Sequence, residues 1–396
     1  MRGEVASCGQ GWRIVPLIQY RKAAAATWTV HTTMKKILIV VGTRPNIIKV
    51  TRFRSVAAKR GRVEVRIVHT GQHFSANMAD VFFQQLGVQP DHCLGIAAGT
   101  PTRQIAEIMT GLEAVIDAER PDLVLVVGDV NSTLAAAVTA NKMGVAIGHL
   151  ESGLRSFDRT MPEEFNRVLT DRLTDHFFVT EQSGIENLRS EKAREESLHF
   201  VGNTMIDTLV AFDPQVQAST ALEDLGLGKG GHVLMTLHRP ATVDAPDRLA
   251  EILDLAADVC RQRQVVFPVH PRTAKNISSF GLKPKADAIE GLVFTEPLDY
   301  FAFQKLIATA GFILTDSGGI QEESTYRRVP CLTLRPNTER PVTVTLGSNE
   351  LVPSDMHAVR EAIARIDAGS FKRGSIPPLW DGHATERVLE VLERVL

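Results

Sequence analysis

The stretch from Thr315 to Glu323 reads Thr-Asp-Ser-Gly-Gly-Ile-Gln-Glu-Glu, a combination of residue types suited to binding a nucleotide. A short apolar run at 311–314 precedes it and predicts a buried strand, and a helix is expected to open there and run through Tyr326. In the turn Ser317-Gly318-Gly319, the two glycines would let the backbone approach an anion, and the free N–H groups of the helix start would point at it. Glu323 would lie about two turns into the helix, where a carboxylate can accept hydrogen bonds from ribose hydroxyls. The simpler alternative is a tight strand–helix turn without a ligand.

A second set of reactive side chains follows other apolar runs of the chain. Asp129 and Glu151 each come directly after such a run, and Glu163 stands at the start of an expected helix. Clustered carboxylates shift one another's pKa values apart, which suits separate acid and base tasks. The alternatives are a helix cap for Asp129 and first-turn helix charges for Glu163 or its neighbour Glu164.

Cationic and imidazole side chains also stand directly after apolar runs or at the start of expected helices. Arg44 precedes Pro45, a residue suited to a first helical turn, and Lys49 follows about one turn later. His238 and His270 each end an expected strand beside an arginine, Arg239 in the first case. We interpret these groups as anion ligands and as a source of a general acid, with solvated surface charges and structural histidines as the alternative.

The elements that must position these groups are alternating strands and helices. Apolar runs, expected to be buried parallel strands, recur along the chain at 37–41, 63–68, 123–127, 145–150, 177–179, 233–237, 265–269, 292–294, 312–314 and 331–334. Because ligands bind beyond the carboxyl ends of parallel strands, polar clusters there predict an active site. The expected fold class is α/β, with two doubly wound, Rossmann-like parallel sheets facing each other across a cleft.

The length of 396 residues favours two domains. We expect a flexible extension or misassigned start at 1–33, a first domain at 34–203 and a nucleotide-binding second domain at 204–379. A last helix within 380–396 is expected to pack back on the first domain.

Composition restricts the class of function. The 44 Lys and Arg residues nearly balance the 46 Asp and Glu residues, so charge favours neither a nucleic-acid nor a membrane partner. The four cysteines are scattered without metal-like spacing, which predicts a reducing cytoplasm and thiols that are buried or inert. The chain lacks the GxxxxGK[ST] motif and a GxGxxG after its first strand, which disfavours ATP hydrolysis and a standard NAD site.

From about Met34 onward, the ordered motifs of the chain resemble the non-hydrolysing UDP-N-acetylglucosamine 2-epimerases of bacteria. The motifs are Gly42-Thr43-Arg44-Pro45, Thr70-Gly71-Gln72-His73, Gly128-Asp129, His149 to Arg155, Pro162 to Arg167, Val201-Gly202-Asn203 and Asp316 to Glu323. The resemblance implies the GT-B architecture, a homodimer, and a reaction without cofactor or metal. In that reaction the C2 proton is removed, UDP leaves to give 2-acetamidoglucal, and UDP adds back as C2 is protonated from the other face.

The resemblance also implies roles, position by position. It makes Asp129, Glu151, Glu163 and His238 catalytic, and it makes UDP-GlcNAc and UDP the partners of the protein. The positions implied to bind substrate or UDP are Arg44, Lys49, Arg167, His270, Ser317, Gly318, Gly319 and Glu323. An activating second UDP-GlcNAc site of some members would fall on Gln72, His73, Arg103, Arg239 and again His270.

Three departures from the family pattern occur, of which Ser75 concerns the activating second site and the other two concern the substrate more than the reaction type. Ser75 stands where members with the activating site carry glutamine, and Asn46 replaces the usual glutamate after Arg-Pro. The stretch from His238 to Asp244 differs from the commoner His-Arg-Arg-Glu-Asn. The alternatives are an epimerase of a UDP-2,3-diacetamido sugar, a hydrolysing epimerase, a GT-B glycosyltransferase and a non-catalytic UDP-sugar sensor.

Overall fold

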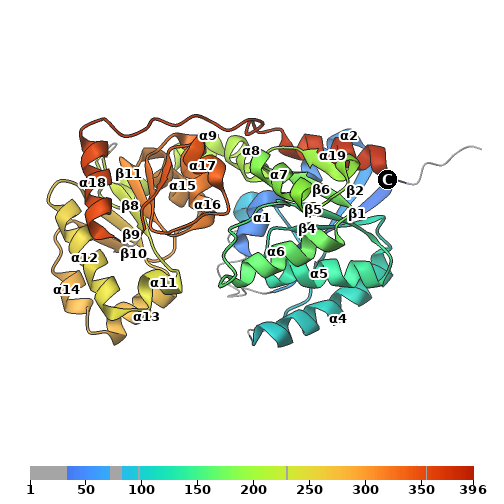
Figure 1. The fold of residues 1–396 in the computed structure, drawn as a ribbon, viewed down its shortest axis with the longest axis horizontal. Helices are drawn as coiled ribbons and strands as arrows, with labels where there is room; N and C mark the ends of the chain where they lie inside the picture. The colour runs from blue at the N-terminus through green and yellow to red at the C-terminus, as the bar shows by residue number, and fades with distance from the viewer. Residues whose placement is uncertain (1–33, 72–82, 97–98, 229–230, 354) are drawn as a thin grey trace, which may run out of the picture. The chain divides into compact units, whose positions relative to one another are not determined.

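The computed structural model describes residues 34–71, 83–96, 99–228, 231–353 and 355–396 (Figure 1). The expected extension at 1–33 lies outside them. In the described part of the chain every paired strand is parallel, and the strands form one sheet of seven and one of six. The fold class expected from the sequence is therefore confirmed.

The first sheet has the order β3-β2-β1-β4-β5-β6-β7. Its strands are β1 (Lys35–Val41), β2 (Val63–His69), β3 (His92–Cys93), β4 (Leu123–Val127), β5 (Ala146–Leu150), β6 (His176–Val179) and β7 (Leu198–Phe200). The accompanying helices are α1 (Arg44–Val50), α2 (Phe53–Arg60), α4 (Pro101–Glu119), α5 (Asn131–Lys142), α6 (Pro162–Leu173) and α7 (Gln182–Ser190).

Alternate residues of the central strands pack in two separate layers. Ile37 and Ile39 of β1 face the core formed with α1, α2 and two later helices, α8 (Thr204–Ala211) and α19 (Ala384–Val395). Leu38 and Val40 face the opposite core, formed with α4 and α5. Because both faces are covered, the strands are apolar throughout, which is the pattern that made them recognisable.

The second sheet has the order β10-β9-β8-β11-β12-β13. Its strands are β8 (Val233–Thr236), β9 (Val265–Pro268), β10 (Leu292–Thr295), β11 (Phe312–Thr315), β12 (Cys331–Thr333) and β13 (Asn349–Leu351). The helices of this half are α9 (Asp213–Ala218), α10 (Ala221–Asp224), α11 (Pro240–Val243), α12 (Pro246–Cys260), α13 (Pro271–Ser279), α14 (Lys283–Asp287), α15 (Tyr300–Thr309), α16 (Gly318–Arg327), α17 (Pro341–Thr345) and α18 (Met356–Asp367).

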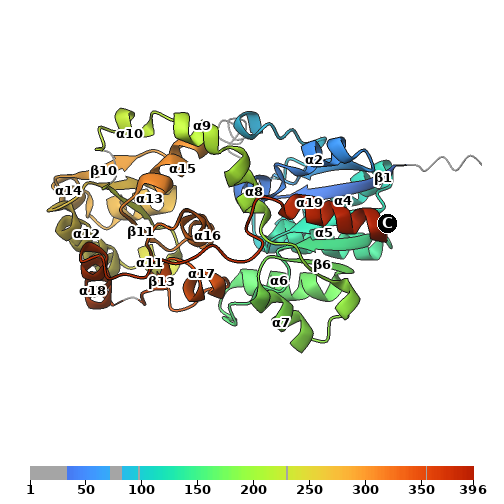
Figure 2. The same cartoon turned by 90° about the horizontal axis from the view of Figure 1, so that it is seen from above.

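The chain ends beside the sheet with which it began. Helix α19 lies against α2 and α8, as Figures 1 and 2 show. Trp380, just before α19, is fully buried in the core of the first sheet, and its indole N–H donates to the Thr180 carbonyl at 3.1 Å. The last segment thus belongs physically to the first sheet.

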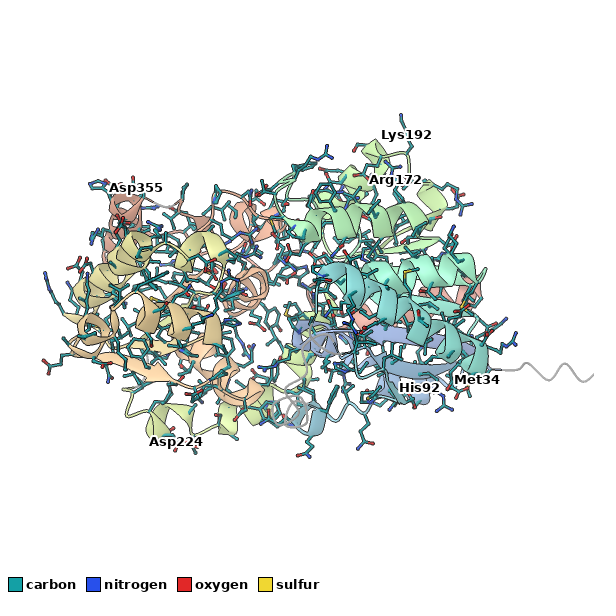
Figure 3. The ribbon with its side chains drawn as sticks, turned by 90° about the horizontal axis from the view of Figure 1, so that it is seen from below. Met34, His92, Arg172, Lys192, Asp224 and Asp355 are labelled. Atoms are coloured by element: carbon teal, nitrogen blue, oxygen red, sulfur yellow. The ribbon has the colours of Figure 1, made fainter. Side chains whose placement is uncertain are left out.

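Surface features complete the description. Charged side chains such as Arg172 and Lys192 project from the first half (Figure 3). Of the described cysteines, Cys331 is buried, Cys260 is partly buried and Cys93 is exposed on the two-residue edge strand β3, so burial accounts for only part of the expected set of buried or inert thiols. Among the described residues, no helix is long and apolar enough to cross a membrane.

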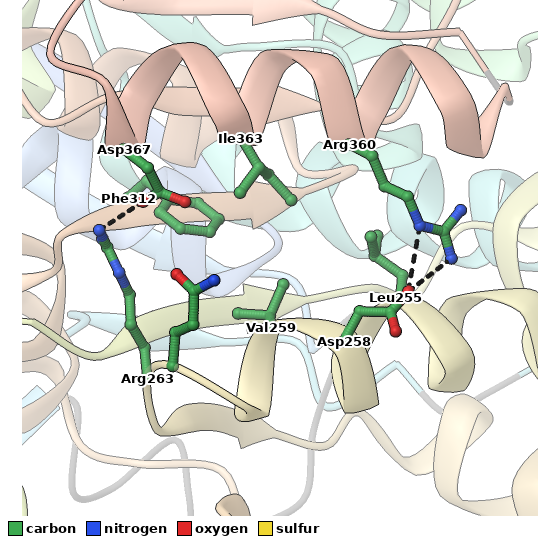
Figure 4. Close-up of a pocket in the computed structure, with 9 residues that line it drawn as sticks. Leu255, Asp258, Val259, Arg263, Phe312, Arg360, Ile363 and Asp367 are labelled. Atoms are coloured by element: carbon green, nitrogen blue, oxygen red, sulfur yellow. Dashed lines mark hydrogen bonds and ion pairs between the residues drawn. The ribbon is translucent and has the colours of Figure 1, made fainter.

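A small pocket of about 90 Å³ lies between α12 and α18 (Figure 4). Ion pairs cross it at both ends, Arg263 with Asp367 and Arg360 with Asp258. Phe312, the first residue of β11, lies on its wall. The pocket is therefore at the end of the sheet opposite to the one where ligands of parallel α/β proteins bind.

Candidate active site

Both sheets reverse their strand order at one place, between β1 and β4 in the first and between β8 and β11 in the second. Such switch points open a crevice at the carboxyl ends of the strands. Arg44 and Asp129 follow β1 and β4, and His238 and Ser317 follow β8 and β11. The topology thus brings candidate residues of each half to the place where a ligand is expected.

Asn46 ties the ends of β1 and β4 together. Its side-chain oxygen accepts hydrogen bonds from the N–H groups of Gly42 and Thr43, both at 3.2 Å, and its amide donates to the Val127 carbonyl at 3.2 Å. A glutamate cannot donate this last bond at neutral pH. The departure at Asn46 therefore has a structural role in positioning Arg44 and the following helix.

Glu151 is held in an unusual backbone conformation beside a buried lysine. It directly follows β5 and has a φ of 69°, a left-handed value that is uncommon for a residue with a side chain and recurs at functional sites. Its carboxylate pairs with the Lys49 ammonium, and both side chains are almost fully buried. Lys49 thus contacts an acid directly.

Gly128 makes room for this pair. A Cβ at this position would lie 3.3 Å from Glu151 Oε2 and 3.4 Å from the Asn46 amide, and its φ of 66° would strain any side chain. Glycine at 128 therefore lets the turn after β4 approach the Lys49–Glu151 pair closely.

Asp129 is positioned by Arg167. The guanidinium of Arg167 lies between the carboxylates of Asp129 and Glu164, and it is buried while the Asp129 side chain keeps 29% of its exposure. Glu164 is itself fixed by the N–H groups of Ser156 and Phe157, each at 2.9 Å. The ion pair with Arg167 therefore orients the Asp129 carboxylate, which remains partly accessible to solvent.

The two acids at the start of α6 have different fates. Glu164 is buried and accepts the hydrogen bonds described above, whereas Glu163 is half-buried and has no hydrogen-bond or ion-pair partner in the described part of the chain. Of the two adjacent acids, Glu164 is thus engaged by the fold and Glu163 is not engaged within the described residues.

His238 is oriented by a buried aspartate. Its Nδ1 lies 3.0 Å from Oδ1 of Asp316, and the ring is stacked at a tilt on His270 with centroids 5.4 Å apart. Burial would raise the pKa of Asp316, but hydrogen bonds from His238 and from two backbone N–H groups hold that pKa below its usual value.

The glycine turn begins α16 as expected from the sequence, and Ser317 at its N-cap makes no side-chain cap bond. A Cβ on Gly318 would lie 2.8 Å from both Arg340 Nη1 and Glu339 Oε1. The absence of a Cβ at Gly318 therefore makes space for the side chains of Arg340 and Glu339 beside the turn.

Glu323 is buried on α16 and accepts a hydrogen bond from the Gln304 amide at 2.7 Å. Burial raises the pKa of Glu323 to about 8, and the neighbouring Glu322 adds to the rise while the Gln304 bond opposes it. The unliganded carboxyl is thus largely protonated at neutral pH.

Arg340 joins acids of both halves. It pairs with Glu322 of α16 at 2.9 Å and with the adjacent Glu339, and it lies 3.8 Å from Glu151 of the first half. Glu339 also pairs with Arg335 at 2.9 Å. This buried network connects the Lys49–Glu151 pair with the helix that carries the glycine turn.

Two of the remaining candidates, Arg239 and His270, lie beside His238, whereas Arg103 lies on α4. Arg103 is exposed at the start of α4 and pairs with Glu107, while Arg239 donates from Nε to the Asp316 carbonyl at 2.9 Å. His270 caps α13, accepting from the Arg272 N–H at 3.2 Å. Gln72, His73 and the divergent Ser75 lie outside the described residues.

Sequence reasoning assigned no role to Arg335, Glu339, Arg340 or Asp316, although all lie among the candidates. A signal existed for the first three. They follow the apolar strand β12 as the candidates follow other strands, so the strand-end rule, extended by one strand, would have indicated them.

The chain is similar to several characterised proteins in sequence and in fold. Residues 56–393 match the family model described as UDP-N-acetylglucosamine 2-epimerase. The chain is 37% identical over 369 residues to the UDP-N-acetylglucosamine 2-epimerase of Methanocaldococcus jannaschii, covering 90% of this chain and 98% of the relative. It is 38% identical over 365 residues to the UDP-2,3-diacetamido-2,3-dideoxy-D-glucuronate 2-epimerase of Pseudomonas aeruginosa, covering 91% and 100%.

Among solved structures, the Methanocaldococcus jannaschii enzyme in complex with UDP-GlcNAc and UDP superimposes with a TM-score of 0.84. The two sequences are 36% identical, and the match covers 91% of this chain and 99% of the other. The two sheets and their helices thus have the GT-B architecture.

Proposed function

Because the chain belongs to the UDP-N-acetylglucosamine 2-epimerase family, we propose that it interconverts UDP-N-acetylglucosamine and UDP-N-acetylmannosamine without releasing free sugar. The observation that carries the proposal is that Arg340 connects Glu151, a carboxylate of the first half, with Glu322 of α16, the helix that begins with the glycine turn. The product would supply N-acetylmannosamine units for a surface polysaccharide.

The proposed reaction has two tasks, proton transfer at C2 and stabilisation of the departing UDP, and each is assigned to one half of the protein. A carboxylate removes the proton from C2 as the bond between C1 and the diphosphate oxygen breaks, leaving UDP and 2-acetamidoglucal. The diphosphate oxygen then adds back to C1 while C2 receives a proton on the opposite face. Bonds and charges balance without an oxidant, so the task of the protein is proton transfer and anion stabilisation.

Residues of the first half suit the proton transfers. Asp129 is half-exposed and oriented by Arg167, Glu151 is paired with Lys49, and Glu163 has its carboxylate unengaged in the described structure. These three different environments are what distinct acid and base roles require. We assign the C2 proton transfers to this set as a whole.

Residues of the second half suit the departing diphosphate. The first turn of α16 offers N–H groups that lack intrahelical partners, and His238 and Arg44 add donors. Glu323 would accept hydrogen bonds from the ribose. Together these groups stabilise negative charge as it develops on UDP.

The test is proton NMR of the enzyme with UDP-N-acetylglucosamine in deuterated water. We expect deuterium at C2 together with UDP-N-acetylmannosamine at equilibrium. Free N-acetylmannosamine and UDP would assign the chain to the hydrolysing type instead. Asp129→Asn serves as the control that separates enzymatic from spontaneous exchange.

The identity of 38% to the Pseudomonas aeruginosa enzyme favours one second candidate, a UDP-2,3-diacetamido sugar. The same NMR experiment with UDP-2,3-diacetamido-2,3-dideoxy-D-glucuronate tests it. Exchange at C2 with this sugar alone would replace our assignment of the substrate and leave the reaction type intact.

A further inference from the structure

Asp316 makes more contacts than a helix-preceding residue requires. It is fully buried, and its carboxylate accepts from the backbone N–H groups of His238, at 3.0 Å, and Arg239, at 2.8 Å. The same carboxylate lies 3.0 Å from Nδ1 of the His238 ring. Its own carbonyl accepts from Arg239 Nε at 2.9 Å.

These contacts determine the state of the imidazole. An ionised carboxylate only accepts hydrogen bonds, so the ring nitrogen facing it must carry a proton. His238 therefore has Nδ1–H bonded to Asp316, and Nε2 is the nitrogen left for other partners. The His238 side chain keeps 39% of its exposure while Asp316 has none, so the outward side of the ring is accessible.

Asp316 also joins the two loops at the switch point of the second sheet. It follows β11 and precedes Ser317 and the start of α16, and it holds the loop that follows β8. One residue thus fixes His238 relative to the N–H groups of the helix start.

We propose that Asp316 is a positioning residue, which keeps a proton on Nδ1 of His238 and directs Nε2 toward the diphosphate bound at the start of α16. Once Nε2 is also protonated, the ring donates from Nε2 to the diphosphate as a cation paired with Asp316. The inference rests on the proposed function for the identity of that anion. Asp316 touches no reacting atom in this scheme and acts through His238.

The variant Asp316→Asn tests the proposal. The amide oxygen can still accept the two backbone N–H bonds, but the amide N–H₂ group cannot accept from Nδ1–H. We expect UDP affinity by calorimetry within about threefold of the native value and kcat reduced by at least about 100-fold, the lower range for a positioned acid or base. Asp207→Asn is the matched control, since Asp207 is equally buried and accepts two backbone N–H bonds at the start of α19 without a histidine. It should leave kcat within about twofold, the usual effect of a change remote from the site.

A double-mutant cycle separates positioning from a general structural role. If Asp316 acts through His238, Asp316→Asn adds less than about threefold to the loss already caused by His238→Gln. A full additional loss in the His238→Gln background would overturn the proposal.

The ring nitrogens of His238 give a readout that does not need turnover. In nitrogen-15 NMR at a pH where the ring is neutral, the native protein should show Nδ1 protonated, and Asp316→Asn should move the proton to Nε2. Nδ1 without a proton in the native protein would contradict the inference, even where Asp316→Asn failed to fold. Because this result stands without activity, failure of the proposed function remains distinguishable from failure of the positioning role.

Discussion

At the residue scale, the site separates groups that hold from groups that react. Hydrogen bonds of the fold engage Glu164 and Asn46, whereas Glu163 and Arg44, which precede them in the chain, are the candidates for binding a ligand. The pairing of a held residue with an adjacent candidate recurs at Asp316 and Ser317. Sequence alone cannot divide a pair such as Glu163 and Glu164, because both are carboxylates in the first turn of α6 and differ only in their contacts.

Asp129→Asn should lose most turnover while UDP binding persists. The amide keeps the shape of the side chain and its position beside Arg167, but it cannot take a proton. We expect kcat to fall by about 100-fold or more, within the usual range for a general acid or base, with a UDP dissociation constant within about threefold by calorimetry. Turnover close to the native rate would remove Asp129 from the mechanism.

Binding of UDP should release a proton from Glu323. Burial holds the pKa of its free carboxyl at about 8, so below that pH the carboxyl must lose its proton before it can accept from both ribose hydroxyls. Affinity should therefore rise as the pH increases from 6 to 8, by up to about tenfold per unit. Calorimetry at pH 7 in two buffers of different ionisation enthalpy measures the released proton directly.

Glu323→Gln is the control for this linkage, because it keeps a hydrogen-bonding group and removes the titration. The ionisation of the UDP phosphate itself remains in both proteins and is subtracted by the comparison. Equal proton release by the native protein and the variant would show that Glu323 binds the nucleotide in one protonation state.

At the element scale, sequence reasoning located the central strands of both sheets and one edge strand, β10, which contains the apolar run Leu-Val-Phe. The three it missed, β3, β7 and β13, are each edge strands of two or three residues. These three are short and half solvated, so their sequences lack a continuous apolar run; β13 reads Asn-Glu-Leu. Most candidate residues could be proposed from sequence because they directly follow central strands. Arg340 was missed because it stands at the end of the loop after β12, several residues beyond the strand.

The contact between α7 and α17 contains a buried acid that should make stability depend on pH. Glu181, at the N-cap of α7, accepts from Ser183 Oγ at 2.6 Å and from the Val342 N–H at 3.4 Å. Burial raises the pKa of Glu181 to about 7, with Glu322 adding to the rise and the Ser183 bond opposing it. The folded state thus binds a proton more tightly than the unfolded state, and its advantage is lost as the pH rises from about 4.5 to about 7.

Glu181→Gln should remove this loss. The neutral amide oxygen can accept the same hydrogen bonds, so we expect the variant to be more stable than the native protein at pH 8, by up to about 3 kcal/mol, and similar to it at pH 5. Urea denaturation at both pH values measures the difference. Glu196→Gln, at an exposed site, is the control and should show no such change; a native-minus-variant difference that is the same at both pH values would contradict the prediction.

At the scale of the whole molecule, the order of the segments along the chain differs from the order in which they pack on the two sheets. The polypeptide leaves the first sheet at β7, builds the second sheet, and returns with α19 to the core of the first. Asp207 of α8 accepts the N–H groups of Ala384 at 3.0 Å and Thr385 at 2.6 Å, which fastens the returning helix to the departing one. Both crossings therefore pack in one core, and we expect the core of the first sheet to depend on residues from the end of the chain.

Trp380 is the place to test that dependence. Its side chain is 1% exposed, lies in the core of the first sheet, and donates to the Thr180 carbonyl. Trp380→Ala leaves a large cavity and should destabilise the protein by about 3–5 kcal/mol, the range for such truncations. Trp380→Phe keeps most of the apolar contact and should cost less, roughly the value of a hydrogen bond and a smaller cavity, about 1–2 kcal/mol. Thermal unfolding should give the highest melting temperature for the native protein, a lower one for Trp380→Phe and the lowest for Trp380→Ala.

Since Glu323 and the α16 turn lie in the second half, the UDP affinity of the folded Trp380→Ala variant should stay near the native value. An unchanged melting temperature in Trp380→Ala would mean that the end of the chain contributes little to the core it contacts.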